Sequence, residues 1–373
     1  MTWIVIVVAG LLLAFGNGAN DNFKAVATLY GSGTASYRLS LIWATLTTAL
    51  GSVAAIYLAG KLLDAFSGQG LVPPAVAGDP DFAAAVALGA SGTVWLATRL
   101  GFPVSTTHAL IGALVGSGLV ASSSGIDVTV LAGGFMLPLL TSPFIAVLLT
   151  ALLYPLLRRQ RERLSIDHET CVCIGKQVVA SVPGRLAPAE ALEFAESVSL
   201  SVDDVVTCQI RYQGRMVGIR AGTLLDTAHF FTAGLVSFAR GLNDTPKIAA
   251  LLLVGHFVVP QTSIMLVGAV IALGGWLGAR RIAETMAHRI TSMSPGQGFM
   301  ANLVTAGLVI GASNLGLPVS TTHVACGSLF GIGAVTRQAH WQTIRSIMLA
   351  WFITLPVAGF MGAVCVVLLP LWL

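Results

Sequence analysis

Long apolar stretches dominate the chain, and each is close to the length that crosses a membrane. A bilayer core about 30 Å thick requires roughly twenty apolar residues in a helix. Such stretches recur at residues 3–31, 40–60, 82–100, 104–121, 128–155, 223–257, 261–279, 298–314, 318–336 and 346–371. We therefore predict an all-α polytopic membrane protein. Gly-containing polar motifs break the first and sixth stretches, near residues 16–22 and 240–246.

One polar segment, residues 158–222, divides the apolar stretches into two groups. Apolar and polar residues alternate over Cys171–Val182 and Val202–Ile219, which predicts a few β-strands around a link rich in Pro, Gly and Glu. The expected organisation is a first membrane repeat over 1–157, a small α/β insert over 158–222 and a second membrane repeat over 223–373.

Positive charge orients these segments, because Lys and Arg favour cytoplasmic loops. The insert opens with a cluster of arginines, Arg158, Arg159, Arg161 and Arg163, and is therefore expected in the cytoplasm. If 82–121 and 298–336 form re-entrant hairpins, fifteen of the 20 Lys and Arg lie inside and one lies outside. The other four, Lys24, Arg99, Arg240 and Lys247, lie at membrane depth. The halves are then inverted copies in a multi-pass protein of the cell (inner) membrane.

Composition excludes a water-soluble globular protein. Of the residues, 55% are hydrophobic and only 10% are charged, and the mean hydropathy is +0.84, whereas globular chains are about 25% charged. The 41 glycines suit close helix packing and broken helices in lipid. The five cysteines do not suggest a disulfide framework. Cys171 and Cys173 with Cys208 miss the usual zinc spacing, so we expect packed thiols and no metal site.

Two ordered motifs occur once in each half. The pattern F-x-x-G-x-N-D-x-x-K appears at 15–24 and again at 238–247. The pattern L-G-x-P-V-S-T-T-H appears at 100–108 and 315–323, each time followed by Gly four and eight residues after the His. Inverted repeats with helices broken near mid-membrane point to an alternating-access transporter whose site lies between the halves.

The motifs carry chemistry suited to a small anion. We expect the Gly of G-x-N-D to let a helix unwind, so that freed N–H groups and a helix dipole favour an anion near the Asp. We expect Ser-Thr-Thr to stand at the start of the helix after Gly-x-Pro, where its hydroxyls and unpaired N–H groups can bind oxygen atoms. Two such helix starts from opposite faces would enclose a tetrahedral oxyanion.

The duplicated Gly-x-Asn-Asp and Pro-Val-Ser-Thr-Thr-His elements resemble those of the inorganic phosphate transporter (PiT) family, over both membrane halves but not the insert. The resemblance implies an ion-coupled phosphate symporter, not an enzyme, with no cofactor beyond a coupling ion, sodium or proton. Its expected partners are phosphate or a similar oxyanion and the lipid bilayer, with no nucleic acid; a homo-oligomer is left open. The substrate residues that it implies are Asn20, Asp21, Ser105, Thr106, Thr107, Asn243, Asp244, Ser320, Thr321 and Thr322.

The chain departs from the family signature N-D-V-A-N at two positions. Lys24 and Lys247 replace the second Asn, each one helical turn from its Asp, and we add both to the candidate site. Ionisable groups at membrane depth are functional candidates by default. Each ammonium either binds the anion directly or occupies the place of a sodium ion. Both hypotheses leave proton coupling through Asp21 and Asp244 open, and sulfate competes with phosphate.

Several residues have plainer interpretations. The Ser and Thr residues can also act as helix N-caps, which is compatible with binding. We expect His108 and His323 to fix the hairpins by hydrogen bonds rather than relay protons. Arg99 and Arg240 either tune the charge of the site or pair with Asp residues and carbonyls. A channel is disfavoured by closed tips with buried charges, and a membrane enzyme by the symmetric duplication of every candidate group.

Overall fold

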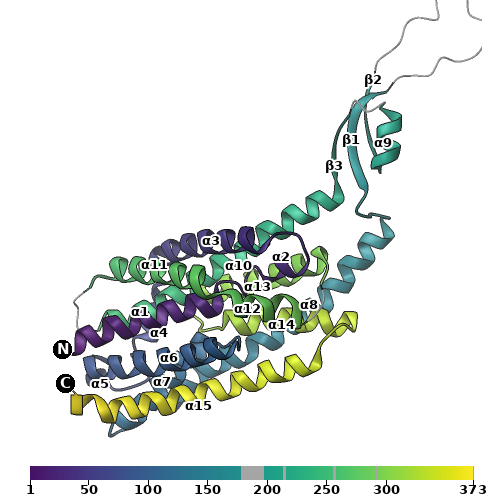
Figure 1. Ribbon diagram of the computed structural model, residues 1–373. Coiled ribbons are helices and arrows are strands. Elements are labelled where there is room, and N and C mark those ends of the chain that lie inside the picture. Colours follow the sequence, from purple (N-terminus) through teal and green to yellow (C-terminus); the bar gives the residue numbers. More distant parts are fainter. Residues whose placement is uncertain (178–196, 213–215, 255–257, 291–292, 373) are drawn as a thin grey trace, which may run out of the picture. The chain divides into compact units, whose positions relative to one another are not determined.

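The structure is a computed structural model that describes residues 1–177, 197–212, 216–254, 258–290 and 293–372 (Figure 1). The chain forms two units: Met1–Tyr154 with His229–Leu373, and Pro155–Ala228. The first is the helical membrane unit, and the second contains a small sheet. The segment predicted as an insert, 158–222, lies within the second unit.

The membrane unit contains one series of helices from each half of the chain. The first half contains α1 (Thr2–Asp21), α2 (Ala27–Gly31), α3 (Tyr37–Leu58), α4 (Gly60–Phe66), α5 (Pro74–Ala77), α6 (Pro80–Leu100), α7 (Thr106–Ala121), the π-helical η1 (Val130–Met136) and α8 (Leu137–Arg163). The second contains α10 (Ala221–Leu252), α11 (Pro260–Gly278), α12 (Arg280–Glu284), the π-helical η2 (Thr285–Arg289), α13 (Pro295–Leu315), α14 (Thr321–Thr336) and α15 (Trp341–Trp372). Within the described ranges, 7 helices are long and apolar enough to cross a membrane. The polytopic helical fold is confirmed.

The two hairpins repeat one local geometry. Helix α6 is followed by Gly101 and α13 by Gly316, both left-handed with φ of 77° and 76°. This conformation favours glycine. After a short extended segment, the Ser105 side chain caps α7 and the Ser320 side chain caps α14. The L-G-x-P-V-S sequence therefore encodes a helix stop, a turn and a new helix start.

The halves are inverted and interlocked. In Figure 1, α1 and α10 run in opposite directions. A Cβ on Gly18 of α1 would lie 2.0 Å from the Ile271 carbonyl oxygen of α11, and one on Gly241 of α10 would lie 2.1 Å from the Thr48 carbonyl oxygen of α3. Each motif helix thus packs backbone to backbone on a helix of the other half, as small residues permit.

The hairpin helices also pack on helices of the other half. Gly116 of α7 packs on Gly359 of α15, and Gly331 of α14 packs on Val147 and Thr150 of α8. These are glycines that follow each motif His by eight residues. Helices α8 and α15 therefore hold the hairpin of the opposite half.

The predicted helix breaks are only partly right. In the first half the break is a turn over Asn22–Val26, after the Asn-Asp pair rather than at 16–22. The break predicted at 240–246 is wrong, because α10 continues through Pro246 to Leu252. Pro246 removes one backbone donor, yet it is buried and the helix persists. Gly18 and Gly241 serve close helix crossing, not unwinding. Residues 255–257 of the sixth predicted stretch lie outside the described part.

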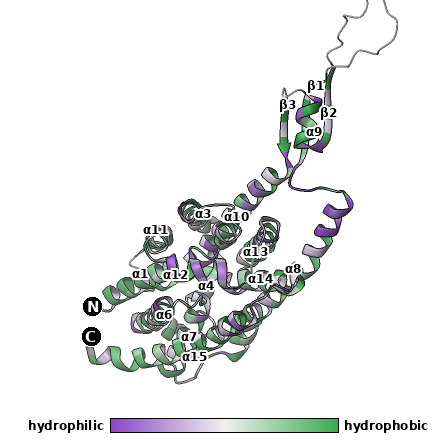
Figure 2. Cartoon of the chain, turned by 45° about the vertical axis from the view of Figure 1, so that its right-hand side comes forward, coloured by the Kyte–Doolittle hydropathy of each residue, from purple (hydrophilic) through white to green (hydrophobic). Residues whose placement is uncertain are grey.

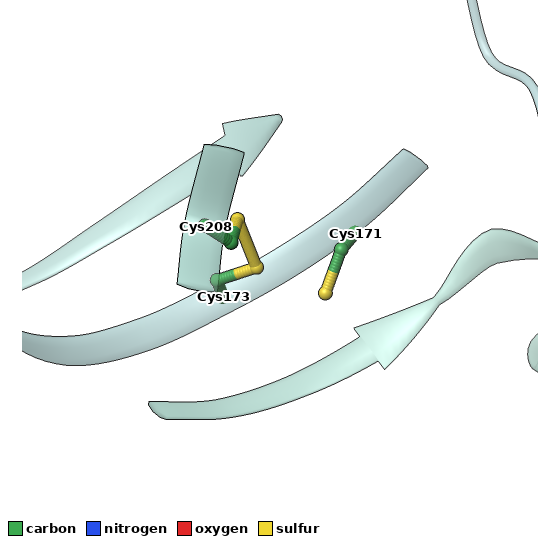
Figure 3. Close-up of side chains that lie close together, drawn as sticks. All are labelled: Cys171, Cys173 and Cys208. Carbon is green, nitrogen blue, oxygen red and sulfur yellow. A yellow bond between two sulfur atoms is a disulfide. The ribbon is translucent and has the colours of Figure 1, made fainter. Parts of the chain in front are cut away.

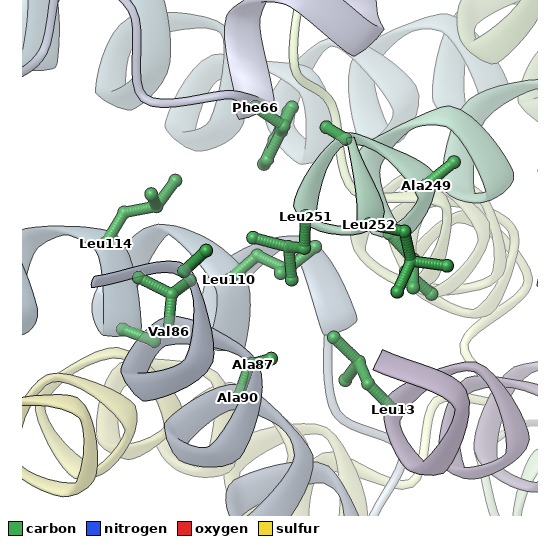
Figure 4. Close-up of a cluster of buried hydrophobic side chains, with 14 of the residues drawn as sticks. Leu13, Phe66, Val86, Ala87, Ala90, Leu110, Leu114, Ala249, Leu251 and Leu252 are labelled. Carbon is green, nitrogen blue, oxygen red and sulfur yellow. The ribbon is translucent and has the colours of Figure 1, made fainter. Parts of the chain in front are cut away.

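Apolar side chains lie both inside the membrane unit and on its surface. Leu13, Phe66, Val86, Leu110 and Leu251 come from five different helices and belong to one buried cluster (Figure 4). Large exposed apolar residues such as Phe144, Phe352 and Phe360 mark the surface of α8 and α15. Figure 2 shows hydrophobic colour over much of these outer helices. A surface of this kind suits lipid, so the chain is an integral multi-pass membrane protein.

The second unit contains a three-stranded antiparallel sheet in the order β2-β1-β3. Its elements are β1 (Thr170–Gln177), β2 (Ser197–Asp204), α9 (Val205–Arg211) and β3 (Met216–Arg220). The strand predicted across Val202–Ile219 is wrong over α9, where the Asp204 side chain accepts a hydrogen bond from the Thr207 N–H and caps a helix. Residues 178–182 of the first predicted strand, and the link that follows, lie outside the described ranges.

The cysteines of this unit also differ from expectation. Cys173 and Cys208 form a disulfide, so the prediction of packed thiols is wrong for these two. Spacing on the chain could not reveal this pair, because α9 brings Cys208 onto the face of β1 that carries Cys171 and Cys173. Cys171 remains a free, buried thiol in the same cluster.

Candidate functional site

The tips of the two hairpins meet inside the membrane unit. The Thr107 hydroxyl donates to the Val319 carbonyl oxygen at 3.3 Å, and the Thr322 hydroxyl donates to the Val104 carbonyl oxygen at 3.1 Å. Each tip thus bonds the extended segment of the other. All twelve predicted site residues are buried, with exposures of 8% or less: Asn20, Asp21, Lys24, Ser105, Thr106, Thr107, Asn243, Asp244, Lys247, Ser320, Thr321 and Thr322.

Lys24 places its ammonium in a cage of oxygen atoms. Its Nζ contacts Asn20 Oδ1 at 2.7 Å, the Val104 carbonyl oxygen at 2.7 Å and Thr322 Oγ1 at 2.8 Å. It also forms a short ion pair with Asp21 Oδ1. These ligands come from α1, from the first hairpin tip and from the second, so one cation joins both halves.

Lys247 makes the mirrored set of contacts. Its Nζ donates to Thr107 Oγ1 and to the Val319 carbonyl oxygen, both at 2.8 Å. Asp244 Oδ1 lies 3.6 Å away and completes an ion pair. The Phe66 ring centroid lies 5.6 Å from the ammonium. The second cation therefore also binds the opposite hairpin tip.

The two carboxylates face a shared set of donors. Asp21 Oδ2 accepts from Asn17 Nδ2 at 2.8 Å and from Thr106 Oγ1 at 3.0 Å. The same Asn17 amide lies 3.3 Å from Asp244 Oδ2 and so bridges the two carboxylates. Thr321 Oγ1 approaches Asp244 Oδ2 at 3.5 Å. Thr106 and Thr321 thus occupy equivalent positions beside the two aspartates.

Arg240 belongs to this network although it was not among the predicted site residues. Its guanidinium donates to Asn22 Oδ1 at 2.9 Å and to Asn17 Oδ1 at 3.0 Å, and its Nε lies 3.9 Å from Asp244 Oδ2. Asn17 and Arg240 occupy equivalent positions of the repeated motif. That alignment was the signal that could have identified both, because equivalent positions near a two-fold axis can touch.

The charges of the site favour an anion. Among the described residues it holds three buried cations, Lys24, Lys247 and Arg240, against two carboxylates, Asp21 and Asp244. One positive charge is left over in an interior where charge is poorly screened. Buried charges of this kind require partners, and an oxyanion would supply one.

The asparagine and serine side chains of the site mainly bond to the backbone of the hairpins. The Asn20 amide donates to the Phe102 carbonyl oxygen at 3.0 Å, while its Oδ1 accepts from the Val104 N–H at 3.2 Å. Asn243 Nδ2 donates to the Val319 carbonyl oxygen at 3.2 Å. Each Asn therefore fixes the extended tip of its own half. Ser105 and Ser320 use their side chains to cap α7 and α14.

The motif histidines meet each other beside the tips. The ring centroids of His108 and His323 lie 4.1 Å apart, and His323 stacks on Trp351 at 3.8 Å. Within the described chain, His108 Nδ1 and His323 Nε2 have no hydrogen-bond partner. The prediction that hydrogen bonds fix the hairpins is wrong for these atoms, where ring contacts replace them. Both rings also line an apolar cavity of about 470 Å³.

Arg99 does not join the site. Its guanidinium lies over the Trp95 ring, 5.8 Å from the centroid, on an exposed part of α6. Of the two arginines singled out in the sequence, only Arg240 contacts the aspartates.

Comparison with known proteins identifies the family to which the chain belongs. The model of the phosphate transporter family matches residues 17–362. A predicted phosphate permease of Mycobacterium bovis is 27% identical, over 98% of this chain and 87% of its own. One of Pyrococcus abyssi is 28% identical, over 97% of this chain and 96% of its own.

A solved structure, titled as the sodium-dependent phosphate transporter, shares the fold. It matches with a TM-score of 0.77 at 22% sequence identity, and the match covers 100% of both chains. Family and fold are those of transporters and not of enzymes, as the sequence predicted. Because the family match extends over both membrane halves and the insert, the chain belongs to the phosphate transporter family.

Proposed function

We propose that this protein is a secondary active transporter that carries inorganic phosphate with a coupling ion by alternating access. One observation carries the proposal. Each half places the ammonium of a Lys, paired with an Asp one helical turn away, against the hairpin tip of the other half, and the two sets are related by the inverted repeat. Membership of the phosphate transporter family supports the substrate class.

Hydrogen-bond chemistry favours phosphate over sulfate. Lysine, arginine and threonine side chains donate to oxyanion oxygens, and both anions accept such bonds. Monohydrogen phosphate also carries an O–H that a carboxylate such as Asp21 or Asp244 can accept. Sulfate has no proton to donate, so the carboxylates would only repel it. Sulfate remains the alternative substrate because the site holds one more cation than anions.

The contacts between the halves supply a mechanism for alternating access. Lys24 bonds Thr322 and Lys247 bonds Thr107, so the closed arrangement is held by reciprocal bonds. An anion that draws the ammonium groups away from these hydroxyls weakens the bonds between the tips. One half can then rock against the other, which opens the site to one side at a time.

The lysines also bear on the coupling ion. Four oxygen atoms surround the Lys24 ammonium, including a carboxylate and a carbonyl, which are ligands that a sodium ion also takes. We propose that the tethered ammonium fills this place and that protons, carried through Asp21 and Asp244, drive uptake. Sodium coupling is the competing possibility.

Uptake by proteoliposomes tests substrate and coupling together. Labelled phosphate and sulfate are offered under an imposed sodium gradient, an imposed pH gradient, or neither. We expect phosphate uptake that follows the pH gradient and ignores sodium. We expect Lys24→Asn and Lys247→Asn each to lower uptake at least about tenfold, since each removes an interaction of roughly 1.4 kcal/mol or more.

Arg345→Gln is the matched control, because it removes an exposed cation of α15 and should leave uptake unchanged. Strict sodium dependence that survives both lysine substitutions would refute the role given to the lysines. Faster uptake of sulfate than of phosphate would show that the substrate is sulfate. Passive flux without a coupling ion would show that the protein is a channel and not a secondary active transporter.

We further propose that the protein lies in the cell (inner) membrane with the Pro155–Ala228 unit in the cytoplasm. Arg158, Arg159, Arg161 and Arg163 support this orientation. Protease treatment of sealed inside-out and right-side-out vesicles checks it, because only the inside-out vesicles should lose the unit.

A further inference from the structure

Three sulfur atoms converge in the Pro155–Ala228 unit, apart from the transport site (Figure 3). Cys171 and Cys173 are two residues apart on β1 and point to the same face of the sheet, as alternate strand residues do. Cys208 approaches them from α9. All three sulfurs lie within 4.8 Å of one another, and the residues are 1%, 0% and 0% exposed.

The sheet leaves room for these sulfurs. Gly218 on β3 pairs with Cys173, and a Cβ at this glycine would lie 2.6 Å from Cys171 Sγ and 3.4 Å from Cys173 Sγ. A side chain there would therefore occupy the space that the thiols use. The glycine, the paired strands and α9 together form a small pocket filled by sulfur.

Polar groups adjoin one edge of the cluster. The Ser201 hydroxyl lies 3.9 Å from Cys208 Sγ, and the Tyr212 hydroxyl donates to Ser201 Oγ at 3.0 Å. A hydroxyl next to a sulfur can donate a weak hydrogen bond, which favours a thiolate over a thiol.

We propose that the three cysteines, once the Cys173–Cys208 disulfide is reduced, bind one thiophilic d¹⁰ metal ion of the Zn(II), Cd(II) or Cu(I) class. A metal–sulfur bond is about 2.3 Å, so three thiolates around one ion lie about 4 Å apart. Cys171 Sγ lies within 4.8 Å of the other two sulfurs, and the bonded sulfurs of Cys173 and Cys208 have to separate to this spacing after reduction. Soft thiolate ligands select such ions over Mg(II) or Ca(II).

Electrons and protons balance in both steps, the reduction of the disulfide and the binding of the metal ion. A phosphine or dithiol reductant supplies two electrons, and with two protons the disulfide becomes two thiols at Cys173 and Cys208. The metal ion then displaces the protons of the three thiols. In the cytoplasm, where we propose that this unit lies, thiols are kept reduced, and the metal-binding form is the one favoured there.

Cadmium binding to the purified full-length protein tests the proposal. The protein is reduced with a phosphine, freed of reductant without oxygen, and titrated with Cd(II). Thiolate-to-metal absorption and elemental analysis report the binding. We expect one tightly bound cadmium ion per reduced chain, none in the oxidised chain, and affinity at least about 100-fold weaker in Cys171→Ser.

Two control variants separate a metal site from simple packing. The double variant Cys326→Ser/Cys365→Ser lacks the two cysteines of the membrane unit and should keep the bound ion. Cys171→Ser should still form the Cys173–Cys208 disulfide when oxidised, which alkylation and mass measurement show, so its loss of cadmium does not reflect an unfolded unit.

Gly218→Ala keeps every thiol but narrows the pocket, and we expect it to weaken binding. The proposal is overturned if the reduced wild type binds no more cadmium than Cys171→Ser, or if the Cys326→Ser/Cys365→Ser chain loses the ion.

Discussion

Lys24 and Lys247 are tolerated in the membrane interior because oxygen atoms replace their water. A buried cation without partners costs several kcal/mol, and each lysine finds a carboxylate, a carbonyl and a threonine hydroxyl. The ligands come from both halves. Each buried ammonium, which would destabilise the fold if it were unpaired, therefore connects the two halves. Arg240 has the same dependence on Asn17, Asn22 and Asp244.

Removing one member of such a pair is expected to harm the protein more than removing both. Lys24→Met leaves Asp21 buried beside only neutral donors, and the expected loss of stability is about 3–5 kcal/mol. Lys24→Met/Asp21→Asn removes both members of the ion pair, so neither charge is left without its partner and much of that stability should return. Unfolding in detergent, followed by tryptophan fluorescence, measures all four members of this cycle.

Asp21→Asn completes the cycle, and Arg345→Gln shows the effect of losing an exposed cation. If the double variant is less stable than Lys24→Met by the full cost of Asp21→Asn, the two side chains do not interact and the pairing described here is incorrect.

At the scale of helices, glycine positions decide which helices can cross closely. Gly112 and Gly116 of α7 lie on α15, while Gly327 and Gly331 of α14 lie on α8. The contacts are backbone to backbone, or nearly so, and leave no space for a methyl group. The hairpins are therefore fixed against the last helix of the opposite half.

A methyl group at one crossing should separate the helices. In Gly116→Ala the new Cβ would lie 1.9 Å from the Gly359 carbonyl oxygen, which cannot move without its helix. We expect a loss of at least about 2 kcal/mol from overpacking, measured as a lower midpoint of thermal unfolding in detergent.

Gly307→Ala on α13 is the matched comparison, since a Cβ there meets nothing within 4 Å. It should be neutral or gain up to about 1 kcal/mol from helix propensity. Equal behaviour of the two variants would show that the α7–α15 crossing is looser than described.

Sequence patterns predicted the hairpins well and the helix breaks poorly. Gly101 and Gly316 signal their turns locally, since the positive φ and the following Pro need no information from the rest of the fold. The role of Gly241 depends instead on Thr48, a residue far away in the chain. A glycine that permits helix crossing and one that ends a helix look the same in sequence.

Sequence repetition also indicated which polar residues the fold brings together in the candidate site. Duplication marked the Asn-Asp and Ser-Thr-Thr positions twice, which separated them from ordinary polar residues. Arg240 and Asn17 differ between the copies, so repetition did not mark them, although they touch. The disulfide between Cys173 and Cys208 required the fold of α9 over β1.

For the whole molecule, inversion relates two bonds that hold the hairpin tips. Thr107 with Lys247 and Thr322 with Lys24 are equivalent contacts on opposite sides of the two-fold relation between the halves. In the alternating-access cycle that we propose, opening toward one side would break one bond before the other. The balance between inward-open and outward-open forms would therefore depend on the relative strength of the two bonds.

Removing one hydroxyl at a time should shift that balance in opposite directions. Thr107→Val and Thr322→Val keep the side-chain shape and lose the bond from the lysine ammonium, about 1.5–3 kcal/mol. Each also loses the bond that its hydroxyl donates to a carbonyl of the other tip. We expect opposite changes in the phosphate KM measured in right-side-out and inside-out vesicles. Thr107→Val/Thr322→Val should restore near-symmetric values, whereas changes of the same sign in both single variants would contradict the rocking mechanism.

The contact between the His108 and His323 rings has a consequence for the origin of the chain. A residue can touch its own counterpart only on the axis that relates the two copies, so this contact marks that axis. If the halves arose by gene duplication, two separate short proteins, inserted into the membrane in opposite orientations, would have met at the same histidine. Fusion of two such proteins would turn that meeting of identical subunits into an intramolecular contact, around which each copy of the sequence could diverge.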